Sequence, residues 1–410
     1  MRAFGKSSEV NQAVIFCGGF GTRINKITRK VPKPLIKINN KEFILYLLEF
    51  LSENNFKEAL LLCHYKSNLF KKYHNITINK LKVKCIREKF PLGSAGALVN
   101  AFTKLEKHFL ILNGDTYFDF NVLDLCRKFN ASKYDACLAT TNVKGNKYNF
   151  INQSKGTVKS FSRRKNKSNL INTGFVILKK KIFNNIKKSF LTLEDDIYKI
   201  LIKKNRLQAV KYLNKNFLDI GTYSDLKKSS SFLKKIELKP AAFLDRDGVL
   251  NYDYGYVHKK ENFKWKKNIF EGLNFLRNNN YRIFIISNQS GISRGYYTIA
   301  DVNKLHDWVN EVLKGHGSII SQFYIAAYHP EFRKSTNLPI FNSNLRKPNL
   351  GMLTKCFKEW KIDKRKSFVI GDKVTDQIMA KNFRLKFKYA KKNTNFLRLV
   401  KKILNDIPNY

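Results

Sequence analysis

The sequence predicts an α/β protein with two doubly wound domains, and three observations support this prediction. The chain has 410 residues, more than one compact domain of roughly 100–200 residues usually holds. Short apolar runs alternate with longer amphipathic segments along nearly the whole chain, which is the pattern of βαβ units. That alternation stops once, in a stretch rich in serine and lysine at residues 229–240, and then starts again. Hydrophobic residues make up 43% of the chain and aromatic residues 13%, which excludes a largely disordered protein.

The first half is predicted to form a mainly parallel sheet with helices on both faces. Apolar runs short enough for strands alternate there with segments long enough for helices, and the helical crossovers of a parallel sheet cover both of its faces. The expected strands are residues 13–17, 58–63, 81–86, 108–112, 136–140 and 171–178, and the expected helices are residues 43–53, 95–103, 122–129 and 194–203.

The second half repeats this alternation after the interruption, and the chain is expected to divide there. We predict a first domain at residues 1–234, a linker at 235–240, a second domain at 241–390 and a basic helical tail at 391–410. In the second domain the expected strands are residues 241–244, 282–286, 322–327 and 366–370, and the expected helices are residues 269–277, 300–313 and 350–360.

The chain is strongly basic, with 78 Lys and Arg residues against 31 Asp and Glu residues and a formal net charge of +47. Such a surplus usually indicates nucleic acid or an anionic membrane as a partner. Here the lysines are spread from one end of the chain to the other, and Asn, Ile, Phe and Tyr are also abundant. Biased composition together with anionic substrates explains the charge better, so we expect no dedicated nucleic-acid binding.

Cysteine usage and hydropathy indicate a cytoplasmic protein. The six cysteines form no C-x-x-C pair and lie mostly in apolar runs, which is typical of reduced, buried thiols. No apolar stretch approaches the roughly 18 residues of a membrane span. The glycine-rich loop at 18–21 follows the N-terminus too soon for a signal peptide. The sequence carries no signal for an oligomeric state.

A glycine-rich loop directly follows the first expected strand and predicts a phosphate site. Gly18, Gly19 and Gly21 allow backbone N–H groups to approach phosphate oxygens closely, and Arg23 and Lys33 add fixed positive charge. A glycine-rich loop alone is also the composition of an ordinary turn. The position of the lysine between two prolines makes the phosphate interpretation the better one.

Together with six later segments, this loop resembles the signature of sugar-1-phosphate nucleotidyltransferases, and most closely that of heptose-1-phosphate guanylyltransferases. The segments are G-G-F-G-T-R at 18–23, P-K-P-L at 32–35, E-K-F-P-L-G-S-A-G-A at 88–97, N-G-D at 113–115, N-T-G at 172–174, L-E-D-D at 193–196 and D-I-G-T at 219–222. The resemblance covers roughly residues 11–232 and implies a Rossmann-like nucleotidyltransferase sheet.

The resemblance implies a role for each matched residue. Asp115 and Asp219 would hold Mg²⁺, which neutralises phosphate charge while the sugar phosphate attacks the α-phosphorus of a nucleoside triphosphate. Relatives often carry F-x-E-K before the N-A-G segment, where this chain has Phe161-Ser162-Arg163-Arg164, so the sugar pocket is expected to differ. The implied nucleotide contacts are Gly18, Gly19, Gly21, Thr22, Arg23, Lys33, Glu88 and Gly93, of which Arg23 and Lys33 are also catalytic, and the implied sugar contacts are Asn172, Gly174 and Glu194.

The second half opens with two aspartates, Asp245 and Asp247, where an expected strand ends. Because side chains alternate along a strand, both carboxylates point the same way into the mouth of the sheet. Three further polar segments follow at strand ends or before a helix, which makes a chance turn a poor explanation. They are S-N-Q-S at 287–290, R-K-P at 346–348 and G-D-K at 371–373 with Asp376.

This set resembles the haloacid-dehalogenase phosphatases, and among them the D,D-heptose 1,7-bisphosphate 7-phosphatases, over about residues 241–390. It implies a haloacid-dehalogenase-like parallel sheet in which Asp245 is the nucleophile and Asp247 the general acid and base. Ser287 and Lys347 would steady the phosphoryl oxygens. Mg²⁺ would be held by Asp245, Asp372 and the backbone carbonyl of Asp247. The implied substrate contacts are Asp253, Tyr254, Gly255, Tyr256, Ser287, Asn288, Gln289, Ser290, Arg346 and Lys373.

The structural zinc loop of these phosphatases has no counterpart in the sequence. Relatives carry C-P-H-H-P and C-x-C, where this chain has A-A-Y-H-P at 326–330 and S-N-L at 343–345. His329 without any thiolate cannot hold zinc. We therefore expect Mg²⁺ at both sites and no zinc.

The leading hypothesis is a bifunctional enzyme of nucleotide-activated heptose synthesis, supplying a lipopolysaccharide or surface polysaccharide precursor. Its second domain would remove the 7-phosphate of D-glycero-D-manno-heptose 1,7-bisphosphate, and its first would transfer a nucleotidyl group, expected from GTP, to heptose 1-phosphate. Two alternatives stay open. One keeps both chemistries on another sugar, as a hexose-1-phosphate nucleotidyltransferase beside a sugar- or histidinol-phosphate phosphatase. The other is a basic nucleic-acid-binding or regulatory protein with inactive sites, which the intact set Asp245, Asp247, Lys347 and Asp372 disfavours.

Overall fold

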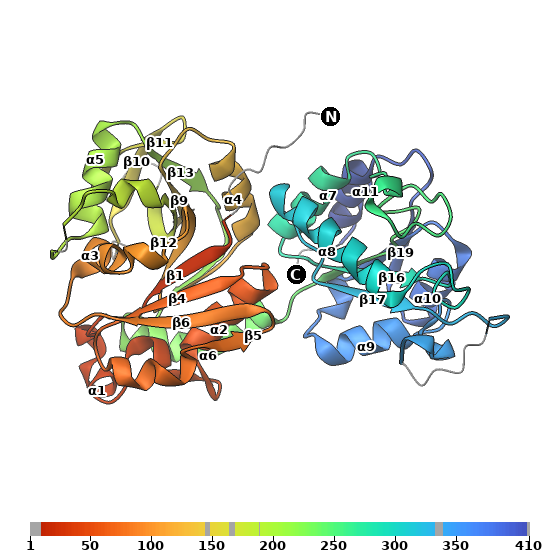
Figure 1. Ribbon diagram of the computed structural model, residues 1–410, viewed down its shortest axis with the longest axis horizontal. Coiled ribbons are helices and arrows are strands. Elements are labelled where there is room, and N and C mark those ends of the chain that lie inside the picture. Colours follow the sequence, from red (N-terminus) through yellow and green to blue (C-terminus); the bar gives the residue numbers. More distant parts are fainter. Residues whose placement is uncertain (1–9, 144–147, 164–168, 188, 333–338, 408–410) are drawn as a thin grey trace. The chain divides into compact units, whose positions relative to one another are not determined.

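The computed structural model describes residues 10–143, 148–163, 169–187, 189–332 and 339–407. The chain divides into two compact units, Met1–Lys234 and Lys235–Tyr410, each with its own large sheet (Figure 1). The linker expected at 235–240 is not a separate segment throughout, because helix α6 (Tyr223–Glu237) continues through its first three residues.

Among the described residues, the first unit holds a ten-stranded mixed sheet in the order β10-β11-β13-β9-β12-β7-β1-β4-β6-β5. Strands β7, β1, β4 and β6 run parallel, whereas β12 runs antiparallel to both β7 and β9. The strands are β1 (Gln12–Phe16), β4 (Glu58–Cys63), β5 (Ile76–Ile78), β6 (Leu81–Arg87), β7 (His108–Asn113), β9 (Ala136–Asn142), β10 (Phe150–Ser154), β11 (Thr157–Ser162), β12 (Leu170–Lys179) and β13 (Leu207–Lys211).

The prediction of a mainly parallel first sheet is correct for the half around β1 and wrong for the half around β12. Strands β1, β4 and β7 are buried apolar runs, as a sheet covered on both faces requires, whereas β6 alternates buried residues with exposed lysines. Strands β10 and β11 at the other end are rich in Asn, Gln, Ser and Lys, so no apolar run marks them as strands in the sequence. Without them the return of the chain through antiparallel β12 could not be seen.

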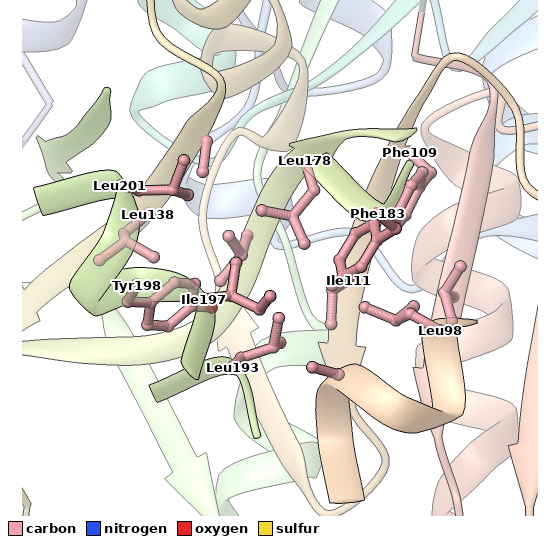
Figure 2. Packing of buried hydrophobic residues seen from close by; sticks show 14 of the residues in the cluster. Leu98, Phe109, Ile111, Leu138, Leu178, Phe183, Leu193, Ile197, Tyr198 and Leu201 are labelled. Carbon is pink, nitrogen blue, oxygen red and sulfur yellow. The ribbon is translucent and has the colours of Figure 1, made fainter. Parts of the chain in front are cut away.

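Helices cover both faces of this sheet. On one face, α3 (Gly93–Asn100) and the helical turns of the π-helix Leu193–Tyr198 and α5 (Lys199–Lys203) pack on strand residues such as Ile111 and Leu138 (Figure 2). On the opposite face lies α2 (Phe43–Glu53), whose Phe50 ring meets the ring of Phe175 at 5.9 Å between centroids. The alternation of side chains along a strand separates the two sets, since Val176 next to Phe175 belongs to the first face. The remaining helices of this unit include α1 (Asn25–Thr28), α4 (Val122–Asn130) and α6.

Two short strands, β8 (Thr116–Asp119) and β14 (Asn216–Asp219), form a separate antiparallel pair in the same unit. Another small pair joins β2 (Lys37–Ile38) and β3 (Lys41–Glu42). None of these was predicted, because runs of two to four residues are too short to show a periodicity. The β8–β14 pair joins two predicted metal ligands, since Asp115 precedes β8 and Asp219 ends β14.

Over its described residues, the second unit contains a five-stranded sheet in which neighbouring strands run parallel, in the order β17-β16-β15-β18-β19. The predicted parallel sheet is therefore confirmed in this unit. The edge strand β19 was not predicted. The strands are β15 (Ala241–Leu244), β16 (Arg282–Asn288), β17 (Gln322–Ala326), β18 (Phe368–Gly371) and β19 (Lys386–Tyr389).

Helices also cover both faces of the second sheet. Ala242 and Leu244 of β15 point into one core, with α7 (Ile269–Asn278), α8 (Ile299–Gly315) and α11 (Phe396–Asn405). Ala241 and Phe243 point into the other, with α9 (Gly351–Glu359) and α10 (Val374–Asn382). Since both faces of β15 are buried, the residues that follow it emerge at the carboxyl edge of the sheet.

The C-terminal segment 391–410 was predicted to be a basic tail, and over its helix this prediction is wrong. Phe396, Val400 and Ile403 of α11 are buried in the same core as α7. Their spacing of three and four residues places them on one helix face, while the lysines and arginine between them face outward. The helix is an integral layer of the second unit.

Phe396→Ala is expected to destabilise the second unit by about 3–5 kcal/mol, because it opens a cavity in a core that this side chain fills. For a unit of this size the melting temperature should fall by roughly 10 °C, measured by thermal unfolding of the full chain. Arg398→Ala on the exposed face of the same helix is the control and should change stability by less than about 0.5 kcal/mol. Equal effects of the two variants would show that the helix is a detachable tail after all.

No helix among the described residues combines the length and the apolar character needed to pass through a bilayer. All six cysteines are free thiols, and five of them are buried, with Cys85 partly exposed.

Candidate active sites

The glycine-rich loop of the first unit lies beside the segment that follows β7. β1 and β7 are parallel neighbours with Phe16 opposite Asn113, so the residues after both strands meet at one edge of the sheet. They enclose a cavity between them. Its lining residues are Phe16, Cys17, Gly19, Gly21, Lys33, Pro34, Asn113, Gly114 and Asp115.

Lys33 and Asp115 form a salt bridge in this cavity. The Lys33 Nζ lies 2.8 Å from the Asp115 Oδ2, and the lysine is buried at 8% exposure. Gly19 and Gly21 contribute only backbone to the cavity wall, which suits a phosphate group. The predicted phosphate-binding lysine and one predicted metal ligand are thus brought into direct contact.

Asp219 reaches the same site through the β8–β14 pair. In this pair Asp219 lies opposite Thr116, and the Ile220 N–H donates to the Asp115 carbonyl at 2.9 Å. A second cavity joins the two aspartates, and it shares Asn113 and Asp115 with the first. Its lining residues are Arg23, Asn113, Asp115, Thr116, Tyr148, Asn172, Thr173, Phe217 and Asp219.

Sequence reasoning missed two aromatic residues of this second cavity. Tyr148 donates a hydrogen bond from its hydroxyl to Asp219 Oδ2 at 3.3 Å, and its ring meets that of Phe217 at 5.7 Å between centroids. Phe217 lies two residues before the D-I-G-T segment at 219–222, and the segment does not show into which cavity its side chain points. For Tyr148 the sequence offers no signal.

The other predicted contacts of the first unit are not among the residues that line these two cavities. Gly18 packs against His64 and lies near Glu88, whose burial raises the pKa of its carboxyl group. Gly174 lies against the Asn113 side chain. Thr22 and Glu194 are exposed, and neither is among the residues that line the two cavities.

Gly93 has a structural reason to be glycine. Its φ is +74°, and a Cβ there would meet the Leu191 carbonyl oxygen at 2.3 Å. The close approach lets the Ala95 N–H donate to the same carbonyl at 2.9 Å. A glycine at position 93 therefore allows the start of α3 to form hydrogen bonds with the 191–193 segment. Of the two arginines that replace the family's acid-base pair, Arg163 follows β11 and Arg164 lies outside the described residues.

In the second unit the predicted catalytic residues meet at the carboxyl ends of three neighbouring strands. Asp245 follows β15, Ser287 lies near the end of β16, and Asp372 follows β18, in the sheet order β16-β15-β18. Because parallel strands end at the same edge, residues far apart in the chain form one site. Asp245 and Ser287 are buried at 6% and 1% exposure.

Lys347 enters this site as a buried cation. Its Nζ lies 2.9 Å from Asp245 Oδ2 and 2.6 Å from Asp376 Oδ1, and it donates to the Ile286 carbonyl at 2.9 Å. Burial raises the pKa of Asp245, while the ammonium group of Lys347 opposes that rise. Asp376 is a positioning residue for Lys347, and its second oxygen accepts the Lys373 N–H at 3.1 Å.

The carboxylates of Asp245, Asp372 and Asp376 could hold a metal ion. Their oxygen atoms lie within 4.8 Å of one another. Asp372 Oδ1 is buried and has no hydrogen-bond partner among the described residues, as expected of an oxygen reserved for a cation. Gly248, with a φ of +89°, leaves the room that Asp372 needs, since a Cβ there would lie 2.1 Å from its Oδ2. Such an oxygen set fits a hard divalent cation.

The Asp247 carboxylate is directed away from this group and is fixed by three donors. Arg246 Nη2 donates to Oδ2 at 2.8 Å, Asn251 Nδ2 to Oδ1 at 3.0 Å, and Gln289 Nε2 to Oδ2 at 3.0 Å. Arg246 is fully buried. The arrangement agrees with the expectation that Asp247 offers its backbone, not its carboxylate, to a metal.

Two of the predicted substrate contacts, Asn288 and Gln289, have side chains that are hydrogen-bonded within the protein. The Asn288 amide donates to the Lys347 carbonyl at 3.2 Å and accepts its N–H at 3.0 Å. Gln289 is buried at 1% exposure, with both ends of its amide hydrogen-bonded to protein groups. The S-N-Q-S pattern gave no sign of which side chains turn inward.

Other predicted substrate contacts surround the mouth of the site. Asp253 accepts a hydrogen bond from Lys373 Nζ at 3.2 Å and from the Gly255 N–H at 3.0 Å. Tyr254 and Tyr256 are 60% and 44% exposed.

Ser290 is partly buried, and Arg346 donates to the Tyr328 carbonyl at 3.1 Å. His329, the single histidine of the A-A-Y-H-P segment, forms a hydrogen bond with Arg294 at 3.1 Å.

Comparison with known proteins matches a different family to each unit. Residues 12–236 match the nucleotidyl transferase family, and residues 241–396 match the family described as polynucleotide kinase 3 phosphatase. Both resemblances read from the motifs are confirmed.

Individual relatives carry the names of two different enzymes. The first unit is similar to D-glycero-alpha-D-manno-heptose 1-phosphate guanylyltransferase of Campylobacter jejuni, with 35% identity over 52% of this chain and 96% of the relative. The second is similar to D-glycero-beta-D-manno-heptose-1,7-bisphosphate 7-phosphatase of Helicobacter pylori, with 38% identity over 37% of this chain and 82% of the relative.

Among solved structures, HddC from Yersinia pseudotuberculosis matches 55% of this chain and 100% of its own with 26% identity and a TM-score of 0.48. By the family and sequence matches, the chain belongs to the nucleotidyl transferase family through residues 12–236 and joins to it, in residues 241–396, a phosphatase.

Proposed function

We propose that the chain catalyses two consecutive steps in the making of a nucleotide-activated heptose. The second unit removes the 7-phosphate of a heptose 1,7-bisphosphate, and the first transfers a guanylyl group from GTP to the resulting heptose 1-phosphate. One observation carries the proposal. The chain is similar to two enzymes, each named for one of these substrates, and it contains a cavity with two aspartates in the first unit and a group of three carboxylates in the second. We further propose a Rossmann-like first unit, a haloacid-dehalogenase-like second unit and a cytoplasmic location.

In the phosphatase, Asp245 attacks the phosphorus of the 7-phosphate, and the bond to the sugar oxygen breaks. Asp247 gives that oxygen a proton and later removes one from the water that hydrolyses the aspartyl-phosphate. Lys347 and Ser287 bind the phosphoryl oxygens. The salt bridges of Lys347 to Asp245 and Asp376 support this role, because they hold its ammonium group within reach of the nucleophile.

In the nucleotidyltransferase, the loop at 18–21 and the side chains of Arg23 and Lys33 bind the triphosphate, and the sugar phosphate attacks its α-phosphorus. No protein nucleophile is needed. Asp115 and Asp219 at the first site, and Asp245 and Asp372 at the second, would hold Mg²⁺, which supplies charge neutralisation to the phosphoryl oxygens when bound.

The proposal is tested by supplying the full chain with D,D-heptose 1,7-bisphosphate, GTP and Mg²⁺. We expect release of inorganic phosphate first, then release of pyrophosphate and accumulation of GDP-heptose. Phosphate assays and chromatography measure these products. The phosphatase relative is named for the β anomer and the transferase relative for the α anomer, so the assay supplies both anomers separately. One anomer must serve both units. If each unit accepts a different anomer, the steps are not consecutive.

The base and the sugar are tested in the same reaction. ATP, CTP, UTP and dTTP replace GTP, and glucose 1-phosphate, mannose 1-phosphate and histidinol phosphate replace the heptose phosphates. Preference for a hexose 1-phosphate or for histidinol phosphate would contradict the heptose assignment while leaving both chemistries in place.

Zinc is expected to be absent from the purified chain at stoichiometric level, because the loop lacks the thiolates that bind structural zinc in relatives. Elemental analysis of dialysed protein measures this, with phosphate release after addition of Mg²⁺ as the control for an intact second unit. A full equivalent of zinc would show that other residues took over the loop's ligand set.

A further inference from the structure

A buried amide, Gln289, connects two groups of the phosphatase site that act on different atoms of the substrate. Its Nε2 donates to Asp247 Oδ2 at 3.0 Å and to Ser287 Oγ at 2.8 Å. Asp247 serves the leaving oxygen, whereas Ser287 serves the phosphoryl oxygens. Among the three donors to Asp247, Gln289 is the one that also reaches Ser287, so it sets the distance between them.

The orientation of this amide is fixed by Tyr297. The Tyr297 hydroxyl donates to Gln289 Oε1 at 2.9 Å, and burial raises the pKa of Tyr297 to about 12, so the phenol keeps its proton. Because the phenol is the donor, the amide oxygen must face Tyr297, and its nitrogen must face Asp247. The His258 ring stacks on the Tyr297 ring at 4.7 Å between centroids and 19° between planes, which holds the phenol in place.

We propose that Gln289 and Tyr297 are positioning residues that aim the Asp247 carboxylate at the leaving oxygen. The inference rests on the proposed phosphatase chemistry. When Asp245 attacks the phosphorus and the bond to the leaving oxygen breaks, the electron pair goes to that oxygen and the proton of Asp247 neutralises it. Without the Gln289 amide, the Asp247 carboxylate still accepts hydrogen bonds from Arg246 and Asn251. It loses the donor that sets its distance from Ser287.

This role predicts a dependence on the leaving group. A sugar alcohol is a poor leaving group and needs the proton, whereas p-nitrophenolate leaves without one. Loss of correct aim should therefore slow hydrolysis of the sugar phosphate strongly and hydrolysis of p-nitrophenyl phosphate little. The ratio kcat/KM is the proper measure, because it covers the steps up to departure of the leaving group and excludes hydrolysis of the aspartyl-phosphate.

The experiment compares full-length Gln289→Met, Tyr297→Phe and Ser287→Ala with the wild type on heptose 1,7-bisphosphate and p-nitrophenyl phosphate. For Gln289→Met we expect kcat/KM to fall about 100-fold on the sugar phosphate and less than about 5-fold on the aryl ester. Tyr297→Phe keeps the packed ring and should give a smaller shift in the same direction. Ser287→Ala should lower both substrates by a similar factor, because the phosphoryl group is common to them.

A matched control is Asn310→Leu in α8. It removes a partly buried amide that donates to the Ile320 carbonyl at 3.2 Å and accepts the Ile320 N–H at 2.9 Å. It should leave the ratio of the two activities unchanged. Thermal unfolding checks that each variant is folded, and Tyr297→Phe carries the test if Gln289→Met does not fold. An equal loss on both substrates, or no loss, in folded variants would overturn the inference while the phosphatase proposal stands. A wild-type chain inactive on both esters would overturn the proposed phosphatase chemistry itself.

Discussion

Asp245→Asn is expected to stop phosphate release from heptose 1,7-bisphosphate, with kcat reduced on the order of 10⁴-fold or more. The substitution keeps the shape of the side chain but replaces the attacking carboxylate with an amide, which is not a nucleophile towards phosphorus. It also leaves Lys347 with Asp376 as its remaining acidic partner. The reaction should then stall at the bisphosphate, measured as inorganic phosphate released per chain.

The same variant separates the two units when heptose 1-phosphate is added. Pyrophosphate release should recover fully, since the first site lies in another unit and is unchanged. Asp301→Asn, the same chemical change at the exposed start of α8, is the control and should retain both activities. Continued phosphate release by folded Asp245→Asn would remove Asp245 from its role, and failed recovery would remove the consecutive order.

Asp115→Asn and Asp219→Asn are each expected to reduce guanylyl transfer by on the order of 10³-fold or more while phosphate release stays within about twofold of wild type. Each substitution removes one negative charge from the pair of carboxylates that the β8–β14 strands bring together. In Asp115→Asn, Lys33 also loses the partner 2.8 Å from its Nζ. Pyrophosphate release from GTP and heptose 1-phosphate measures the first activity.

Asp195→Asn provides the control for this pair of variants. Asp195 is an exposed residue whose carboxylate lies 3.0 Å from Lys199 on the surface. Its loss should change neither activity. A parallel fall of both activities in folded Asp115→Asn or Asp219→Asn would contradict the assignment of two independent sites.

Both sites could be located from the sequence because their central residues follow strands. Each site begins with a short motif that directly follows a buried strand. These motifs are the loop at 18–21 after β1 and the pair Asp245 and Asp247 after β15. In the second unit, where the sheet is parallel, the strand ends alone placed Asp245, Ser287 and Asp372 together. The metal pair Asp115 and Asp219 came from the resemblance, since the strands that join them are too short for a periodic signal.

What could not be predicted depends on contacts between distant segments. The inward turn of Asn288 and Gln289 is set by Lys347 and Tyr297, and no pattern within S-N-Q-S distinguishes an inward from an outward side chain. Asp376 stood out as a further acidic residue, but its salt bridge to Lys347 required the geometry of the folded site. The polar strands β10 and β11 of the first sheet were missed because they lack apolar runs, and with them the antiparallel direction of β12.

The β8–β14 pair also sets the order in which the first unit becomes active during its synthesis. Domains generally fold from the N-terminal side as the chain is made, at about 5–20 residues per second. The parallel strands β1, β4, β6 and β7 and the whole glycine-rich loop are complete long before β14 is translated. Asp115, with Lys33 as its ion-pair partner, is therefore made long before Asp219, which arrives with the last described strand of the unit. A nascent chain stopped before β14 would hold the glycine-rich loop but lack Asp219, so the proposed metal pair is completed only as one of the final events of translation of this unit.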